Sequence, residues 1–136
     1  MYARHVLGSD DCRIAMDAAL NYAQAQQWRV TVAIVDNGGG LLALVRMDTA
    51  SVGSIDGAIE KARSAALTGV ETRFLEQMVA ERPAIVTMRR VAVEGGLPLL
   101  YDGQCMGGIG VSGVQSHQDA EVARTGVLAA AAQWNR

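Results

Sequence analysis

Two strongly β-forming segments on either side of a glycine turn constrain the fold of this chain more than any other feature. Residues 30–35 are Val-Thr-Val-Ala-Ile-Val, residues 37–40 are Asn-Gly-Gly-Gly, and residues 41–47 are again mostly apolar. The Asn-Gly pair permits the positive φ angles that a tight turn between antiparallel strands needs. The sequence therefore predicts a β-hairpin over residues 30–47.

Apolar residues recur at helical spacing in several other parts of the chain. The predicted helices span residues 10–27, 55–68, 72–81 and 117–133. Ser9 is expected to cap the first helix, because its hydroxyl can accept a hydrogen bond from a free backbone N–H group. Ser116 is expected to cap the last helix, where Asp119 completes a pattern similar to a capping box.

A second hairpin is predicted toward the C-terminal end of the chain. Residues 86–93 are expected to be extended, and residues 97–101 and 104–111 are expected to pair around a turn. Pro98 favours an edge strand, because proline donates no backbone hydrogen bond. Since the hairpins join without helical crossovers, the order α-β-β-α-α-β-β-β-α predicts an antiparallel sheet with helices packed on it.

Length and composition exclude several classes of protein. The 136 residues fit a single domain, residues 1–136, and the net charge of −2 argues against nucleic-acid binding. No apolar stretch is long enough to cross a membrane, and the first residues lack the apolar segment of a signal peptide, so a cytoplasmic protein is expected. Cys12 and Cys105 stand apart from any Cys/His cluster, so we expect buried thiols and no metal site.

A glycine-rich segment, Gly108-Ile109-Gly110-Val111-Ser112-Gly113, matches the G-x-G-x-x-G pattern of dinucleotide sites. It lies near the end of the chain, with no second βαβ unit to complete such a site. A strand that a helix or a ligand approaches closely is the favoured interpretation. Ser112 is one residue out of the pattern of a nucleophile elbow, so we expect it to donate a hydrogen bond to a ligand instead.

Charged residues supply the other candidate site positions. Lys61 is the only lysine among 12 basic residues, and it borders the apolar face of its predicted helix. It either reaches water along that border or serves as a compact cation in a site. Arg46 and Asp48 either form a surface ion pair, or Arg46 offers its forked donors to a ligand carboxylate. His5 and His117 are either exposed or ligands of a haem iron.

Several strings together resemble one family. They are Val32-Ala33-Ile34-Val35-Asp36-x-Gly38-Gly39, Arg46-Met47-Asp48, Lys61-Ala62, Gly95-Gly96-Leu97-Pro98 and the glycine-rich segment followed by Asp119. In this order they resemble the GlcG/HbpS-like family, also called the haem-degrading domain family, which includes the C-terminal domain of PduO-type cobalamin adenosyltransferases. The resemblance implies an α/β (α+β), profilin-like fold, with a central antiparallel sheet flanked by helices on both faces, and a homo-oligomer.

The resemblance also implies links to haem, to corrinoid-related operons and to glycolate or diol catabolism, without one common chemistry. It carries Arg46, Asp48, Lys61, Ser112 and Asp119 over as pocket or motif positions, and transfers no haem ligand to either histidine. The sequence departs from many relatives at Thr49, where they have glycine, and at Gly108, where they have alanine.

Three hypotheses follow. The first is a binding protein that holds haem or a small anionic ligand near a subunit interface, with Arg46 and Lys61 as cationic anchors and Gly110 close to the ligand. The second is an enzyme that moves a proton on a small oxo- or hydroxy-acid, with Lys61 as base, Arg46 as carboxylate clamp and Asp119 as orienting group. There Arg46 would be the neighbouring cation that lets Lys61 lose its proton. The third is a structural subunit without a ligand.

Overall fold

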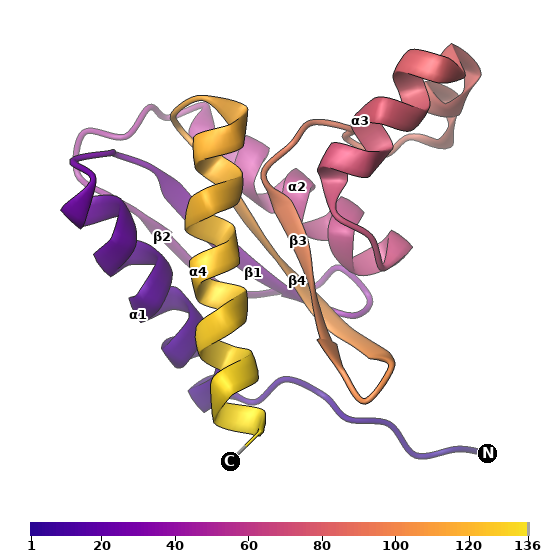
Figure 1. The fold of residues 1–136 in the computed structure, drawn as a ribbon, viewed down its shortest axis with the longest axis horizontal. Coiled ribbons are helices and arrows are strands. Elements are labelled where there is room, and N and C mark those ends of the chain that lie inside the picture. Colours follow the sequence, from indigo (N-terminus) through magenta and orange to yellow (C-terminus); the bar gives the residue numbers. More distant parts are fainter. Residues whose placement is uncertain (136) are drawn as a thin grey trace.

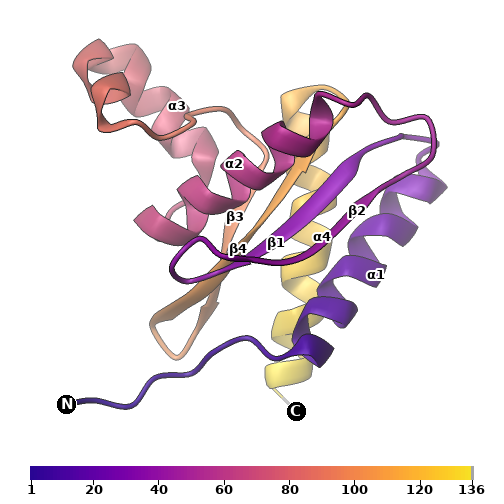
Figure 2. The same ribbon diagram turned by 180° about the vertical axis from the view of Figure 1, so that it is seen from behind.

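The computed structural model describes residues 1–135, which form three layers. The elements, in chain order, are α1 (Ser9–Ala25), β1 (Thr31–Asp36), β2 (Leu41–Arg46), α2 (Ser54–Thr68), α3 (Thr72–Glu81), the 3-10 helix η1 (Pro83–Met88), β3 (Gly96–Tyr101), β4 (Gln104–Ser112) and α4 (Ser116–Trp134). Helices α1 and α4 lie side by side on one face of the sheet (Figure 1), and α2 covers the other face (Figure 2). The α/β fold with helices on both faces is therefore confirmed.

The sheet has four strands in the order β2-β1-β4-β3, and each neighbouring pair is antiparallel. Both predicted hairpins are present, and Pro98 lies in β3, which is an edge strand as predicted. Strand β1 is central and almost entirely buried, whereas β2, the other edge strand, is largely exposed. The edge position of β2 is important for the site described below.

The two faces of the sheet carry cores of different character. Larger side chains, including Ile34, Ile109 and Val122, fill the side under α1 and α4, whereas small residues line the side under α2. A Cβ atom on Gly110 would overlap the Ala58 carbonyl oxygen of α2. The glycine-rich segment is therefore a strand that a helix approaches closely, one of the two interpretations that the sequence favours.

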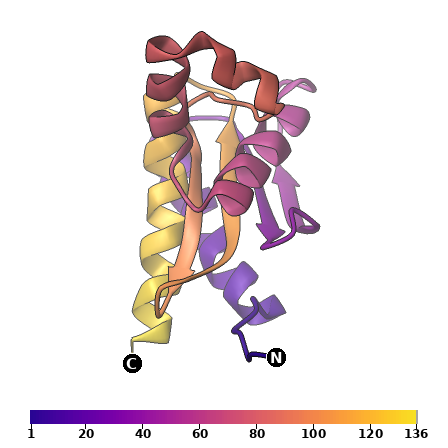
Figure 3. The same cartoon turned by 90° about the vertical axis from the view of Figure 1, so that its right-hand side faces the viewer.

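The segment before β3 differs from the prediction. Residues 86–93 are not a strand: Pro83 begins the 3-10 helix η1, which ends at Met88, and the chain then runs irregularly toward β3. Arg89 has a φ of 60°, in the left-handed region, which a β-strand does not contain. Helix α3 and η1 project from the three layers as a separate arm (Figures 1 and 3).

The first helix is capped differently from the prediction. Its N-cap is Gly8, and Ser9 is already inside the helix. The Gly8 N–H donates a 2.7 Å hydrogen bond to the Asp11 carboxylate, which is the reciprocal bond of a capping box, and the glycine N-cap itself offers no side chain to the first turn. None of the helices among residues 1–135 is long and apolar enough to cross a membrane.

Candidate functional site

Lys61 and Asp119, both selected from the sequence, form a buried ion pair. The Lys61 Nζ lies 3.0 Å from Asp119 Oδ2 and donates a second hydrogen bond of 3.0 Å to the Val111 carbonyl oxygen. The residues are only 5% and 2% exposed. Because Lys61 belongs to α2 and Asp119 to α4, the pair joins the helices that cover opposite faces of the sheet.

Asp119 is held from two sides. Its other carboxylate oxygen accepts a 3.1 Å hydrogen bond from the Val114 N–H, in the turn between β4 and α4. The predicted capping role of Ser116 and Asp119 is wrong, because Gln115 is the N-cap of α4 and the Gln118 side chain accepts the N-cap hydrogen bond. Burial raises the pKa of the Asp119 carboxyl, and the adjacent Lys61 ammonium opposes that rise.

The enclosed ion pair determines what Lys61 can do. Its ammonium is turned away from solvent, and its hydrogen bonds go to the Asp119 carboxylate and the Val111 carbonyl oxygen, so it is not placed to contact a substrate. Arg46, which the sequence suggested as the neighbouring cation, lies on the edge strand β2. Lys61 is bonded to Val111 of β4, and β1 separates these two strands. The geometry therefore favours a structural role for Lys61, as a link between helices, over a role as a base or an exposed anchor.

Arg46 and Ser112 lie in one row across the sheet. The strand register aligns Arg46 with Thr31, and Thr31 with Ser112, so the three side chains share the face toward α2. Ser112 is largely covered, since its Oγ lies 2.6 Å from where a Cβ on Gly57 would stand. Arg46 remains exposed, and within residues 1–135 it forms no ion pair with Asp48, contrary to one predicted alternative.

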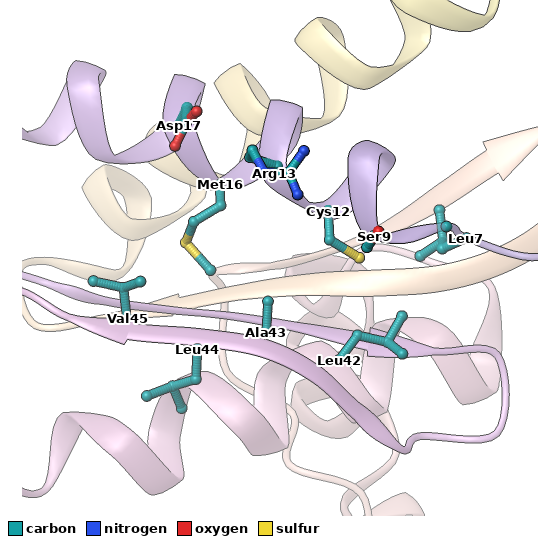
Figure 4. A pocket seen from close by; sticks show the side chains of 11 residues that line it. Leu7, Ser9, Cys12, Arg13, Met16, Asp17, Leu42, Ala43, Leu44 and Val45 are labelled. Atoms are coloured by element: carbon teal, nitrogen blue, oxygen red, sulfur yellow. The ribbon is translucent and has the colours of Figure 1, made fainter.

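The junction between α1 and the edge strand β2, which we name the α1–β2 seam, is hollowed at the surface. Two hollows follow each other along it, of about 430 and 510 Å³. The first hollow is mostly apolar and is shown in Figure 4; its lining residues are Leu7, Gly8, Ser9, Cys12, Arg13, Met16, Asp17, Leu42, Ala43, Leu44 and Val45. The second hollow contains both Arg46 and Asp48 in its lining, together with Arg29.

The seam combines apolar walls with sulfur atoms and charged ends. Cys12 and Met16 are buried on α1 and point toward β2, where Ala43 and Val45 face them (Figure 4). Burial, together with the nearby Asp11 carboxylate, raises the pKa of the Cys12 thiol, so the free protein holds it protonated at neutral pH.

Neither histidine belongs to the seam. His5 lies against Tyr101, with the ring centroids 4.9 Å apart, and His117 is exposed in the first turn of α4. Of the seam residues, the sequence predicts Arg46 and Asp48 as site candidates but not the residues of α1, because Cys12 has the pattern of an ordinary buried thiol. The available clue was the row of apolar residues in the second strand of the first hairpin, which become exposed on an edge strand.

The loop after Arg46 contains a strained residue. Thr49 has a φ of 70°, a conformation that costs a β-branched residue about 1 kcal/mol or more. We expect Thr49→Gly to raise the free energy of unfolding by about 1 kcal/mol, measured by urea denaturation. Ser51→Gly, in the same exposed loop but without a positive φ, should lower it by roughly 0.5 kcal/mol. Destabilisation by Thr49→Gly would show that this backbone is not strained.

Comparison with known proteins agrees with this architecture. The family model described as haem degrading protein HbpS-like matches residues 7–128. The chain belongs to the HbpS-like family. Protein GlcG of Escherichia coli is 40% identical over 114 residues, which cover 82% of this chain and 85% of GlcG.

Solved structures of HbpS-like proteins have the same fold. A double mutant of Streptomyces reticuli HbpS superimposes with a TM-score of 0.89 at 29% identity, covering 94% of this chain and 89% of that one. A complex of PduOC with heme superimposes with a TM-score of 0.84 at 31% identity, covering 92% and 95%. The family resemblance predicted from the sequence motifs is thereby confirmed.

Proposed function

We propose that this HbpS-like protein binds haem in the α1–β2 seam. The observation that carries the proposal is the mostly apolar hollow of about 430 Å³ between α1 and β2, which continues into a second hollow lined by Arg46. Cofactor sites typically occupy 300–1,000 Å³, with apolar walls and a few polar groups that fix orientation. A structural neighbour solved as a heme complex supports haem as the ligand.

The residues of the seam fit the two parts of a haem. Leu42, Ala43 and Val45 of β2 would contact one face of the porphyrin, and Met16 of α1 the other. Arg46 faces α2 in the strand register, but it stands on the edge strand β2 and lines the second hollow. Its long side chain would reach around this edge to pair with a propionate, since a guanidinium donates two parallel hydrogen bonds to a carboxylate. A bound haem supplies an iron with axial coordination positions and redox activity.

The remaining candidate residues lie outside the seam and act on it only through the sheet. Gly110 and Ser112 lie under α2, and the Lys61–Asp119 pair fixes that helix relative to α4. In this proposal they position the sheet on which Arg46 stands and make no contact with the ligand. Asp48 lines the second hollow beside Arg46 and would limit how many anionic groups the seam accepts.

The proposal includes a homo-oligomer whose interface covers the seam. Leu41, Leu42 and Val45 are 50%, 44% and 38% exposed on the edge strand β2, and such an edge favours pairing with a second copy. Both cysteines are free thiols, which agrees with a cytoplasmic, reducing location.

Titration with hemin, followed by the change in its absorbance, tests the proposal. Leu42→Glu puts a charge into the apolar hollow and should weaken hemin binding by about tenfold or more. Arg46→Gln, which removes a propionate partner at the surface, should weaken it by roughly fivefold. The matched controls are Leu128→Glu, at an exposed leucine of α4, and Arg124→Gln, at an arginine paired with Glu71. Equal losses in variants and controls would refute binding in the seam.

A further inference from the structure

The arm of α3 and η1 forms an apolar hollow of its own against the end of α2. The hollow measures about 330 Å³, and its apolar walls are Leu75, Met78 and Val79 of α3, Ile85 and Met88 of η1, and Leu67 of α2. Within residues 1–135 these six side chains belong to neither core of the sheet. Met78 and Met88 are 45% and 70% exposed, so the hollow is open to solvent. Its volume is at the small end of the range for ligand sites.

A single arginine lines the same hollow. The Arg90 guanidinium forms no ion pair within residues 1–135. In that part of the chain its side chain donates one hydrogen bond, of 3.3 Å, to the carbonyl oxygen of the preceding residue. That residue, Arg89, ends η1 with a φ of 60°, and the chain beyond it lines the hollow with Arg90 and Ala92. The hollow therefore has apolar walls and one guanidinium available to an anion.

The arm is positively charged in an otherwise acidic protein. Residues 72–92 contain four arginines and two glutamates, a formal charge of +2, whereas the whole chain carries −2. All the other residues together therefore carry −4. A local surplus of one charge attracts ligands of the opposite charge, so the arm favours an anion over a neutral or cationic ligand.

We propose that the hollow of the arm binds a small monocarboxylate with an unbranched apolar chain, at a site separate from the haem seam. The chain lies against Leu75, Val79 and Ile85, and the carboxylate accepts hydrogen bonds from Arg90. Met78 and Met88 close around the chain, because the flexible methionine side chain adapts to irregular shapes. One arginine suits one carboxylate, whereas a haem brings two propionates.

Protein labelled with ¹³C in the methionine methyl groups tests the site without a variant. Octanoate should shift the signals of Met78 and Met88, and should leave in place those of Met16 and Met47, which line the α1–β2 seam. The affinity should rise about fourfold with each CH₂ group from hexanoate to octanoate, because each added group is buried. Shifts at Met16 and Met47 alone, or no shift at any methionine, would overturn the proposal.

Variants on the arm test the two parts of the ligand separately. Arg90→Gln should weaken octanoate binding roughly fivefold and leave the binding of uncharged octanol unchanged. Its control is Arg89→Gln, at an exposed arginine outside the hollow. Met78→Glu should weaken octanoate binding about tenfold or more, whereas Phe74→Glu, at a similarly exposed position of α3 outside the hollow, should not. Equal losses in a variant and its control would refute this site, whether or not haem binds in the seam.

Discussion

We expect Gly110→Ala to destabilise the protein by more than about 3 kcal/mol, or to prevent its folding. A Cβ at this position would overlap the Ala58 carbonyl oxygen and lie 2.5 Å from the Ala62 amide nitrogen. Both atoms belong to the backbone of α2, so no side-chain rotation relieves the clash. The helix would have to move away from β4, which would open the small-residue core beneath it.

The measurement is urea unfolding followed by circular dichroism, with the yield of soluble protein recorded. Gly53→Ala is the matched control, because a Cβ there has no heavy atom within 4 Å, and the φ of −64° suits alanine. That control should be neutral or slightly stabilising, by about 0.5 kcal/mol. A Gly110→Ala protein with the unfolding midpoint of the wild type would contradict the close packing of α2 on β4.

Lys61→Met should cost about 3–5 kcal/mol of unfolding free energy at neutral pH, as expected when one partner of a buried ion pair is removed. The Asp119 carboxylate would remain 2% exposed with the Val114 N–H as its remaining hydrogen-bond donor within residues 1–135. The double variant Lys61→Met with Asp119→Asn should recover most of the loss, because it removes the unpaired charge and keeps an acceptor for Val114.

The cost of Lys61→Met should depend on pH with a definite sign. Burial already raises the pKa of Asp119 above the usual 3.8, and the nearby Glu94 adds to the rise. For a carboxyl with a raised pKa, the protonated form favours folding, and this contribution is lost as the pH rises through the folded pKa. Without Lys61 the pKa rises further, so the deficit should be smallest near pH 4 and full at pH 7.

Unfolding free energies of the wild type and Lys61→Met, measured at several pH values between 4 and 7.5, test this prediction. Arg13→Met is the control. Arg13 forms an ion pair with Asp10, both side chains are largely exposed, and exposed pairs contribute about 1 kcal/mol or less to stability. A deficit for Lys61→Met that does not change with pH would mean that Asp119 stays in one protonation state, and would contradict the account of the pair.

The parts of the fold that the sequence predicts correctly depend on local patterns. The Asn-Gly turn predicts the first hairpin, and the spacing of Ala58, Ala62, Ala65 and Ala66 predicts the face that α2 buries. The interpretation of residues 86–93 as a strand failed because a β-branched composition does not reveal the left-handed backbone at Arg89. Helix α3 is predicted correctly over residues 72–81, whereas the 3-10 helix η1 and the projection of both helices from the three layers are not predicted from periodicity.

The contacts of the candidate site could not be predicted from local patterns, because they join residues far apart in the sequence. Asp119 follows a serine at capping distance, yet its partner is Lys61, 58 residues away in the sequence. Composition identified Lys61 as unusual but gave no indication that the ammonium would be enclosed by a carboxylate and a carbonyl group. The seam was missed because it depends on α1 crossing an edge strand, a tertiary relation that neither segment encodes alone.

The location of bound haem in solution tests the central claim most directly. Amide spectra of the isotope-labelled protein, recorded with hemin and with diamagnetic zinc protoporphyrin, identify the residues that the paramagnetic ferric iron broadens. We predict broadening around Cys12 and Met16 on α1 and around Ala43 on β2, with the signals of α3 unaffected. Broadening centred on His117 or His5, with the α1–β2 seam unchanged, would contradict the account.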